Sequence, residues 1–275
     1  MSRIQTRLAE LKAQGKTALI PYLTAGDPQP QVTVTLMHDL VAAGADIVEL
    51  GVPFSDPMAD GPVIQRAVER ALAHHVSLLD VLAMVSEFRR QDKTTPVVLM
   101  GYLNPIEAMG RVAFAERAKQ AGVDGVLTVD MPPQEAQSYV SAMKAQGLDC
   151  IFLVSPTTPT SRLAAVNEYG SGFVYYVSLK GVTGSAELNE AAVSAQLQAL
   201  AQHLSLPIGI GFGIRNTQNA YQMARIGDGV IIGSALVSLI EAHAAEGLNA
   251  VKQALIEQMA EFRHAIDQAD KGESL

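Results

Sequence analysis

Eight short apolar segments recur along this chain with amphipathic segments between them, and this alternation constrains the fold more than any other feature. The apolar segments are residues 18–23, 47–50, 97–100, 125–129, 151–154, 173–177, 208–211 and 230–232. Each runs on without polar alternation, as in parallel strands that lie between covering helices and a packed interior. We therefore expect a parallel sheet.

The segments between the expected strands have the periodicity of helices. Candidates are residues 32–43, 64–73, 78–90, 110–121, 133–146 and 217–226. Four of these precede a glycine at a position that favours a left-handed C-cap: Gly44, Gly122, Gly147 and Gly227. Eight strand-then-helix units in 275 residues match a (β/α)8 TIM barrel better than an open doubly wound sheet, which usually has five or six strands.

Both ends of the chain add helices to this barrel. Ile4, Leu8 and Leu11 mark one face of an N-terminal helix. A final helical stripe, which should pack on the outside of the barrel, consists of Leu248, Val251, Leu255, Met259, Phe262 and Ile266. We expect a single domain over residues 1–275, with additional helices after strands two and eight and a loose tail at 270–275.

The composition excludes several classes of protein. Hydrophobic residues make up 48% of the chain, enough for a large core, so disorder is excluded. The net charge of -8 argues against a broad surface for nucleic acid or acidic membranes. The charged N-terminus does not resemble a secretory signal, and the most apolar uncharged run, residues 229–240, is too short to span a bilayer. We expect a cytoplasmic protein.

Metal and thiol chemistry find little support. The single cysteine, Cys150, lies in an apolar strand, where a buried inert thiol is favoured over a nucleophile. Neither the six histidines nor Cys150 form a spacing typical of metal ligands. We expect no metal site.

Glu49 is a carboxylate near the end of the otherwise apolar second strand. One interpretation is a buried structural ion pair with Arg or Lys. The other is catalysis, because active sites of such barrels lie at the carboxyl ends of the strands. There burial would raise the pKa of Glu49 from about 4.3 toward neutrality, where a carboxyl can both give and take a proton.

Asp60 ends the long loop that follows the second strand. Because Gly61 and Pro62 come next, Asp60 is a candidate helix N-cap. Its alternative role is a second acid, on a loop that closes over a substrate bound beside Glu49.

Glycine-bearing turns follow the last three strands, at residues 181–184, 211–213 and 233–234. Glycines let backbone N–H groups approach an anion, and phosphate sites after strands seven and eight recur in this barrel. The residues leave open a sugar-phosphate enzyme, such as an isomerase or a Schiff-base aldolase acting through Lys180, and a phosphate-binding regulatory subunit without chemistry.

Residues 49–65, ELGVPFSDPMADGPVIQ, closely resemble the signature of the tryptophan synthase α-subunit family. The resemblance covers nearly the whole chain, since further matching segments occur in family order at residues 21–28, 100–105, 130–133, 155–159, 181–184, 211–213 and 233–234. It implies a TIM-barrel lyase that cleaves indole-3-glycerol phosphate to indole and glyceraldehyde 3-phosphate without a metal or organic cofactor of its own.

The resemblance also implies roles for individual residues. Glu49 is expected to protonate C3 of the indole and then take the proton of the glycerol hydroxyl, while Asp60 accepts the indole N–H. Tyr175 and Thr183 are expected to support these two acids. The indole is expected to lie against Tyr22, Met100, Tyr102, Leu127, Leu153 and Phe212. The phosphate is expected to bind Gly184, Gly213, Gly233 and Ser234.

By resemblance, the chain pairs with a pyridoxal-phosphate β-subunit, in an α2β2 complex, through residues 53–56, 104–105 and 130–132. One departure from the family is visible. Leu179 and Lys180 stand where the family often has Arg-Ser, which bears on how the loop after strand six is anchored.

Overall fold

Eight parallel strands form a closed barrel in a computed structural model that describes residues 2–177, 190–211 and 213–275. Each strand pairs with its neighbours in sequence, and β8 pairs with β1. The strands are β1 (Ala18–Thr24), β2 (Val48–Gly51), β3 (Val97–Gly101), β4 (Gly125–Thr128), β5 (Asp149–Val154), β6 (Val174–Val177), β7 (Ile208–Gly211) and β8 (Gly229–Ile232). The predicted TIM barrel is confirmed.

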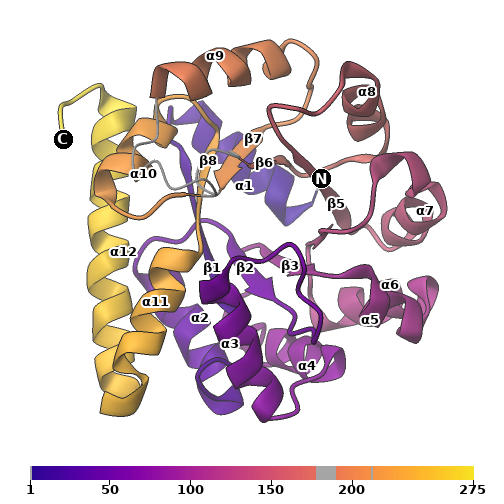
Figure 1. The fold of residues 1–275 in the computed structure, drawn as a ribbon, viewed down its shortest axis with the longest axis vertical. Helices are drawn as coiled ribbons and strands as arrows, with labels where there is room; N and C mark the ends of the chain where they lie inside the picture. The colour runs from indigo at the N-terminus through magenta and orange to yellow at the C-terminus, as the bar shows by residue number, and fades with distance from the viewer. Residues whose placement is uncertain (1, 178–189, 212) are drawn as a thin grey trace.

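Helices surround the strands (Figure 1). They are α1 (Arg3–Ala13), α2 (Thr33–Ala42), α3 (Pro62–Ala73), α4 (Leu78–Phe88), α5 (Leu103–Met109), α6 (Arg111–Ala121), α7 (Gln137–Ala145), α8 (Thr160–Tyr169), α9 (Glu190–Ala201), α10 (Thr217–Ala224), α11 (Ser234–His243) and α12 (Leu248–Lys271). Short 3-10 helices lie at Pro30–Val32, Pro133–Glu135 and Ala244–Glu246. The predicted helix 133–146 is therefore two elements. The additional helices after β2 and β8 are confirmed.

Successive apolar residues of most strands belong to two different apolar clusters, as a two-sided strand requires. On β2, Val48 and Leu50 pack in the large cluster under the helices, whereas the preceding Ile47 packs in a second cluster that fills the barrel. Glu49 follows the alternation of Ile47 and therefore points into the barrel.

The N-terminal helix α1 closes the barrel at the end where the strands begin. Its buried residues Ile4, Leu8 and Leu11 belong to the interior cluster. Arg3 and Arg7 reach Asp124 and Asp46, both at 2.7 Å. These aspartates stand just before β4 and β2, so α1 is fixed to the opposite end of the barrel from the loops expected to carry chemistry.

Three of the four predicted glycine caps are confirmed. Gly44, Gly122 and Gly147 have φ of 103°, 92° and 71°. Gly227 does not have a positive φ, so the prediction for it is wrong. A Cβ at Gly227 would lie 2.7 Å from Cδ1 of Ile210, and close packing against β7 is the reason for glycine there.

The C-terminal helix α12 packs along the barrel with most of the predicted stripe buried, but Leu248 is 38% exposed and does not belong to it. Asp270 and Lys271, expected in a loose tail, are the last residues of α12. Asp270 accepts hydrogen bonds from the N–H and the hydroxyl of Thr17.

Among residues 2–177, 190–211 and 213–275, no single helix is long and apolar enough to cross a membrane. Helices α3 and α4 meet that test only as a pair, and the pair is bent by 93°.

Candidate active site

Glu49 is buried inside the barrel without a hydrogen-bonding partner. Its side chain is 1% exposed, and within the described part of the chain neither carboxylate oxygen has a hydrogen-bond partner or forms a salt bridge. A structural ion pair with Arg or Lys therefore finds no support there. An unpaired buried carboxyl is stable mainly in its neutral form.

The electrostatic surroundings of Glu49 favour the protonated acid. Burial, and then the negative charge of Asp60, raise the pKa of Glu49 from 4.5 to about 8. At neutral pH the Glu49 carboxyl is therefore protonated in most molecules. A carboxyl with a pKa near the working pH is suited to general acid and general base catalysis.

Asp60 stands just before α3 but does not cap it. The N-cap residue is Gly61, and no side chain provides the cap hydrogen bond. The Asp60 carboxylate instead accepts a hydrogen bond of 3.0 Å from the hydroxyl of Tyr102, and the Asp60 carbonyl accepts one from Gln65. The N-cap interpretation is wrong, and the carboxylate of Asp60 is turned toward the barrel.

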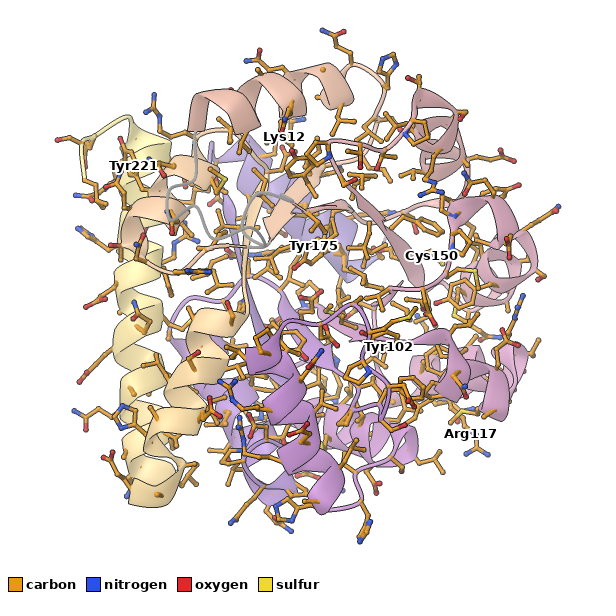
Figure 2. The ribbon with its side chains drawn as sticks, in the orientation of Figure 1. Lys12, Tyr102, Arg117, Cys150, Tyr175 and Tyr221 are labelled. Carbon is orange, nitrogen blue, oxygen red and sulfur yellow. The ribbon has the colours of Figure 1, made fainter. Side chains whose placement is uncertain are left out.

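The two acids influence the same aromatic side chains. The charges of both Glu49 and Asp60 raise the pKa of Tyr22, and both raise that of Tyr175, in each case after the larger effect of burial. Tyr22 is also the register partner of Glu49 on β1. These groups therefore face a common space inside the barrel, and Figure 2 shows Tyr175 near the middle of the molecule.

Part of the predicted indole wall gathers around Asp60. A small cavity is lined by Asp60 together with Tyr22, Met100 and Tyr102. Leu127 and Leu153 do not line it; they pack with Met100 in the interior cluster. Phe212 lies outside the described residues. The cavity also has walls that sequence reasoning missed: Val52, Phe54, Val68, Gly101 and Val129.

Two glycines make room for the tyrosines of this site. A Cβ on Gly51 would overlap the hydroxyl of Tyr22, and a Cβ on Gly211 would overlap the hydroxyl of Tyr175. Neither glycine has a positive φ, so the close approach of the ring explains each. Gly211 was expected as part of a phosphate turn, and its contact with Tyr175 is a different reason for its presence. No sequence signal links a glycine to a distant aromatic ring.

The expected phosphate end of the site lies at the start of α11. Gly233 is its N-cap, Ser234 is its first residue, and a glycine at the N-cap provides no side-chain hydrogen bond to the first turn. An uncapped helix N-terminus offers N–H groups to an anion. A Cβ on Gly233 would lie 3.6 Å from Cβ of Tyr22, so this helix end adjoins the acid-bearing space. Gly213 has a φ of 81°. Thr183 and Gly184 lie outside the described residues, as do Leu179 and Lys180.

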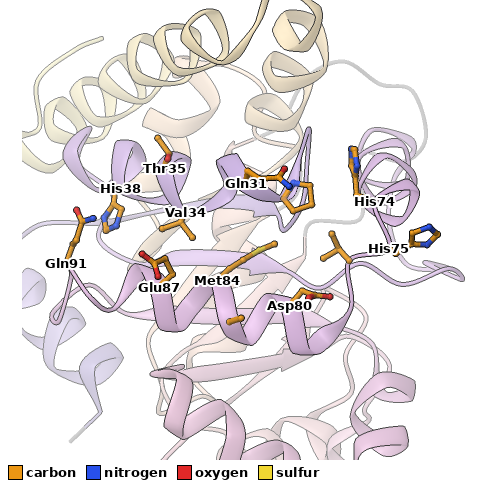
Figure 3. A pocket seen from close by; sticks show the side chains of 13 residues that line it. Gln31, Val34, Thr35, His38, His74, His75, Asp80, Met84, Glu87 and Gln91 are labelled. Carbon is orange, nitrogen blue, oxygen red and sulfur yellow. The ribbon is translucent and has the colours of Figure 1, made fainter.

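A larger cavity of about 730 Å³ lies outside the barrel, between α2, α4 and the turn that joins α3 to α4 (Figure 3). It contains His38, His74 and His75, but the described residues include no group of three or more His, Cys, Asp or Glu that could hold a metal ion. It contains neither of the two candidate acids.

Cys150 is 1% exposed on the helix-facing side of β5, and burial raises the pKa of its thiol to about 12. The predicted buried thiol is confirmed.

The sequence matches the family of tryptophan synthase alpha chains over residues 8–267. The tryptophan synthase alpha chain of Hydrogenovibrio crunogenus is 63% identical over 270 residues, which are 98% of this chain and 99% of the relative. That of Laribacter hongkongensis is 59% identical over 267 residues, which are 97% and 100% of the two chains.

Solved structures give the same result. Tryptophan synthase subunit alpha from Legionella pneumophila str. Paris superposes with a TM-score of 0.92 at 48% identity, covering 98% of this chain and 99% of that one. An aminoacrylate-bound tryptophan synthase from M. tuberculosis gives a TM-score of 0.85 at 36% identity, covering 97% and 100%.

Proposed function

Because this chain belongs to the tryptophan synthase alpha chain family, we propose that Glu49 and Asp60 carry out that family's reaction in it. The protein is a lyase that cleaves indole-3-glycerol phosphate to indole and glyceraldehyde 3-phosphate. Membership of the family decides against an isomerase, a Schiff-base aldolase or a regulatory subunit without chemistry.

Glu49 acts first as an acid and then as a base. Its carboxyl donates a proton to C3 of the indole, which leaves Glu49 as a carboxylate. The carboxylate then removes the proton of the glycerol hydroxyl next to C3, the carbon–carbon bond breaks, and its electron pair returns to the indole ring. Glu49 ends protonated again, so the cycle needs no other proton carrier. The pKa of about 8 supports this sequence, because both forms are accessible near neutral pH.

Asp60 acts as the fixed anion. When C3 is protonated the indole nitrogen becomes positively charged, and a carboxylate that accepts its N–H stabilises this state. The placement of Asp60 in one cavity with Tyr22, Met100 and Tyr102 supports the role, since aromatic and apolar walls around a single polar group are typical of ligand sites. We also assign Leu127, Leu153 and Phe212 to the indole site, beyond the residues that line this cavity, and we assign Tyr175 and Thr183 to the support of the acids.

The phosphate binds at the opposite side of the site. We assign it to Gly184, Gly213, Gly233 and Ser234, where the uncapped N-terminus of α11 supplies positive partial charge. The overall charge of -8 makes such a local site necessary for an anionic substrate. No metal or organic cofactor takes part in the proposed steps of this chain.

Family membership implies a β-subunit as partner. We propose an α2β2 complex in which residues 53–56, 104–105 and 130–132 face a β-subunit that holds pyridoxal phosphate and receives the indole. Within these segments Ser55, Asp56 and Asn104 are exposed, whereas Pro53 and Met131 are buried. Direct contact therefore belongs to the exposed residues.

The observation that carries the assignment is Glu49 itself, which is buried, has no hydrogen-bond partner among the described residues and is exposed to the negative charge of Asp60. Its test is indole release from indole-3-glycerol phosphate by Glu49→Gln, with binding of glycerol 3-phosphate measured in parallel. We expect turnover to be abolished and affinity for the phosphate to be nearly unchanged. Equal loss of both would mean that Glu49 is structural. A borohydride-trapped adduct on Lys180 would instead show Schiff-base chemistry.

A further inference from the structure

The loop that carries Asp60 contacts a single side chain near both of its ends. We propose that Tyr102 is a positioning residue, which fixes this loop and hydrogen-bonds the charged carboxylate of Asp60. The role goes beyond that of a wall against the indole ring, and it rests on the proposed function of Asp60.

The hydroxyl of Tyr102 makes two hydrogen bonds to the end of the loop. It donates to Oδ2 of Asp60 at 3.0 Å and accepts from the N–H of Ala59 at 3.0 Å. One group thus fixes both the backbone next to Asp60 and the orientation of its carboxylate. A hydrogen bond to a charged acceptor is stronger than one between neutral groups.

The ring of Tyr102 also contacts the start of the loop. Its centroid lies 5.3 Å from that of Phe54, with 33° between the ring planes. The N–H of Val52 is hydrogen-bonded to the carbonyl of Met100 on β3 at 2.8 Å. Residues 52–60 are therefore attached to the end of β3 at both sides, and Tyr102 provides most of that attachment.

Tyr102 is itself held by rigid structure. It is 5% exposed and is the N-cap residue between β3 and α5. The next N–H, that of Leu103, donates to Oδ1 of Asp130 at 2.8 Å, so the following loop fixes the start of α5. Because Tyr102 is held in place in this way, its hydroxyl can fix the position of the loop. A mobile side chain would instead move with the loop.

The charges around Asp60 make the hydroxyl important. Asp60 is faced by Glu49 of β2, Tyr22 of β1, Tyr175 of β6 and Tyr102. Burial raises the pKa of Asp60, and the hydrogen bond from Tyr102 is the influence that lowers it among the described groups. Without this bond Asp60 would take up a proton more readily, and a neutral Asp60 does not stabilise a cation.

The test is Tyr102→Phe, which keeps the ring and its contacts but removes both hydrogen bonds. The matched control is Tyr139→Phe, since Tyr139 is a buried tyrosine whose hydroxyl bonds Thr128 at 2.8 Å, on the helix-facing side of the sheet. Two quantities are measured: the pKa of Asp60 by carbon NMR titration of the free protein, with Asp60→Asn to identify its signal, and the pH profile of kcat and KM for indole release.

We expect Tyr102→Phe to raise the pKa of Asp60 and to move the acidic limb of kcat/KM to higher pH by the same amount, with a tenfold loss in rate on that limb for each pKa unit. The loss should lie in kcat more than in KM, because the wall remains. Tyr139→Phe should change neither quantity. If neither the pKa of Asp60 nor the acidic limb of kcat/KM changed, Tyr102 would only line the indole site and would not position Asp60. If the wild type released no indole, the proposed roles of the acids would fail, and the NMR titration would still decide whether Tyr102 controls Asp60.

Discussion

Burial of Glu49 makes the stability of the protein depend on pH, because the folded state favours the protonated carboxyl. A buried acid whose pKa rises on folding binds more protons in the folded state than in the unfolded state, between its two pKa values. For Glu49 this interval runs from 4.5 to about 8. The free energy of unfolding therefore falls as the pH rises through that interval.

Glu49→Gln should remove this dependence. We expect the variant to match the wild type in stability near pH 4.5 and to exceed it by a few kcal/mol above pH 8, because each pKa unit corresponds to about 1.4 kcal/mol. Urea unfolding at both pH values measures the difference. A variant less stable than the wild type at high pH would mean that the ionised Glu49 has a partner.

The two acids should also give a bell-shaped profile of activity. Turnover requires a protonated Glu49 and an ionised Asp60, so the rate should fall as the pH rises through about 8 and fall again at acidic pH, where Asp60 takes up a proton. The pH dependence of kcat/KM for indole release measures both limbs. A rate that kept rising well above pH 8 would contradict the acid role of Glu49.

Gly51 offers a test of packing around the site. Gly51→Ala would bring a Cβ into the hydroxyl and ring of Tyr22, so we expect a loss of about 1–3 kcal/mol in stability and a higher KM. Gly61→Ala is the control, because a Cβ there meets nothing within 4 Å and its φ is -73°. The double variant Gly51→Ala with Tyr22→Leu should recover stability but not KM. Thermal unfolding with steady-state kinetics separates the two effects, and equal effects of both alanines would refute the overlap.

At the scale of single residues, the sequence indicated which side chains are unusual but not which side chains they contact. Glu49 was recognisable because a carboxylate is rare in an apolar strand. The N-cap interpretation of Asp60 failed, because Gly61 takes that place and the partner of Asp60 is Tyr102, 42 residues away in the chain. The pairs Gly51 with Tyr22 and Gly211 with Tyr175 arise from barrel closure, which no local pattern encodes.

At the scale of elements, the apolar pattern placed all eight strands to within about two residues, since continuous apolar runs are governed by local burial. The sequence also indicated the apolar face of α1, but not that this face fills the end of the barrel. That position depends on charges brought together by the fold, where Arg7, Arg263 and the N–H of Leu19 all bond Asp46.

The closing role of α1 can be tested at Ile4, which is 0% exposed in the barrel interior. Ile4→Ala should destabilise the protein by about 2–5 kcal/mol, because it leaves a cavity in a packed core. Val112→Ala, at a residue that is 62% exposed, should change stability by less than about 0.5 kcal/mol. Denaturant midpoints compare the two, and similar small losses would mean that α1 only rests on the barrel.

At the scale of the whole molecule, a network of charges joins the two halves of the site. Arg70 on α3 donates to both oxygens of the buried Asp27, after β1, at 2.7 and 2.9 Å. Arg70 and Arg66 also bind Glu241 on α11, whose first turn is the proposed phosphate site. The helix that follows Asp60 is thus tied to the helix that would hold the phosphate.

Arg70→Met should leave the carboxylate of Asp27 buried and unpaired, so we expect a loss of about 3–5 kcal/mol in stability. Adding Asp27→Asn should restore part of it, since the uncompensated charge is gone. A double-mutant cycle on the free energy of unfolding measures this coupling. Additive losses would show that the pair does not act as a unit.

The position of helix α1 limits how substrate and products can reach and leave the active site. Its apolar side chains fill the barrel at the end where the strands begin, whereas Glu49, Asp60 and the start of α11 lie toward the other end. Substrate and both products therefore cannot pass through the end of the barrel that α1 fills, and they must enter and leave toward the end where the strands finish.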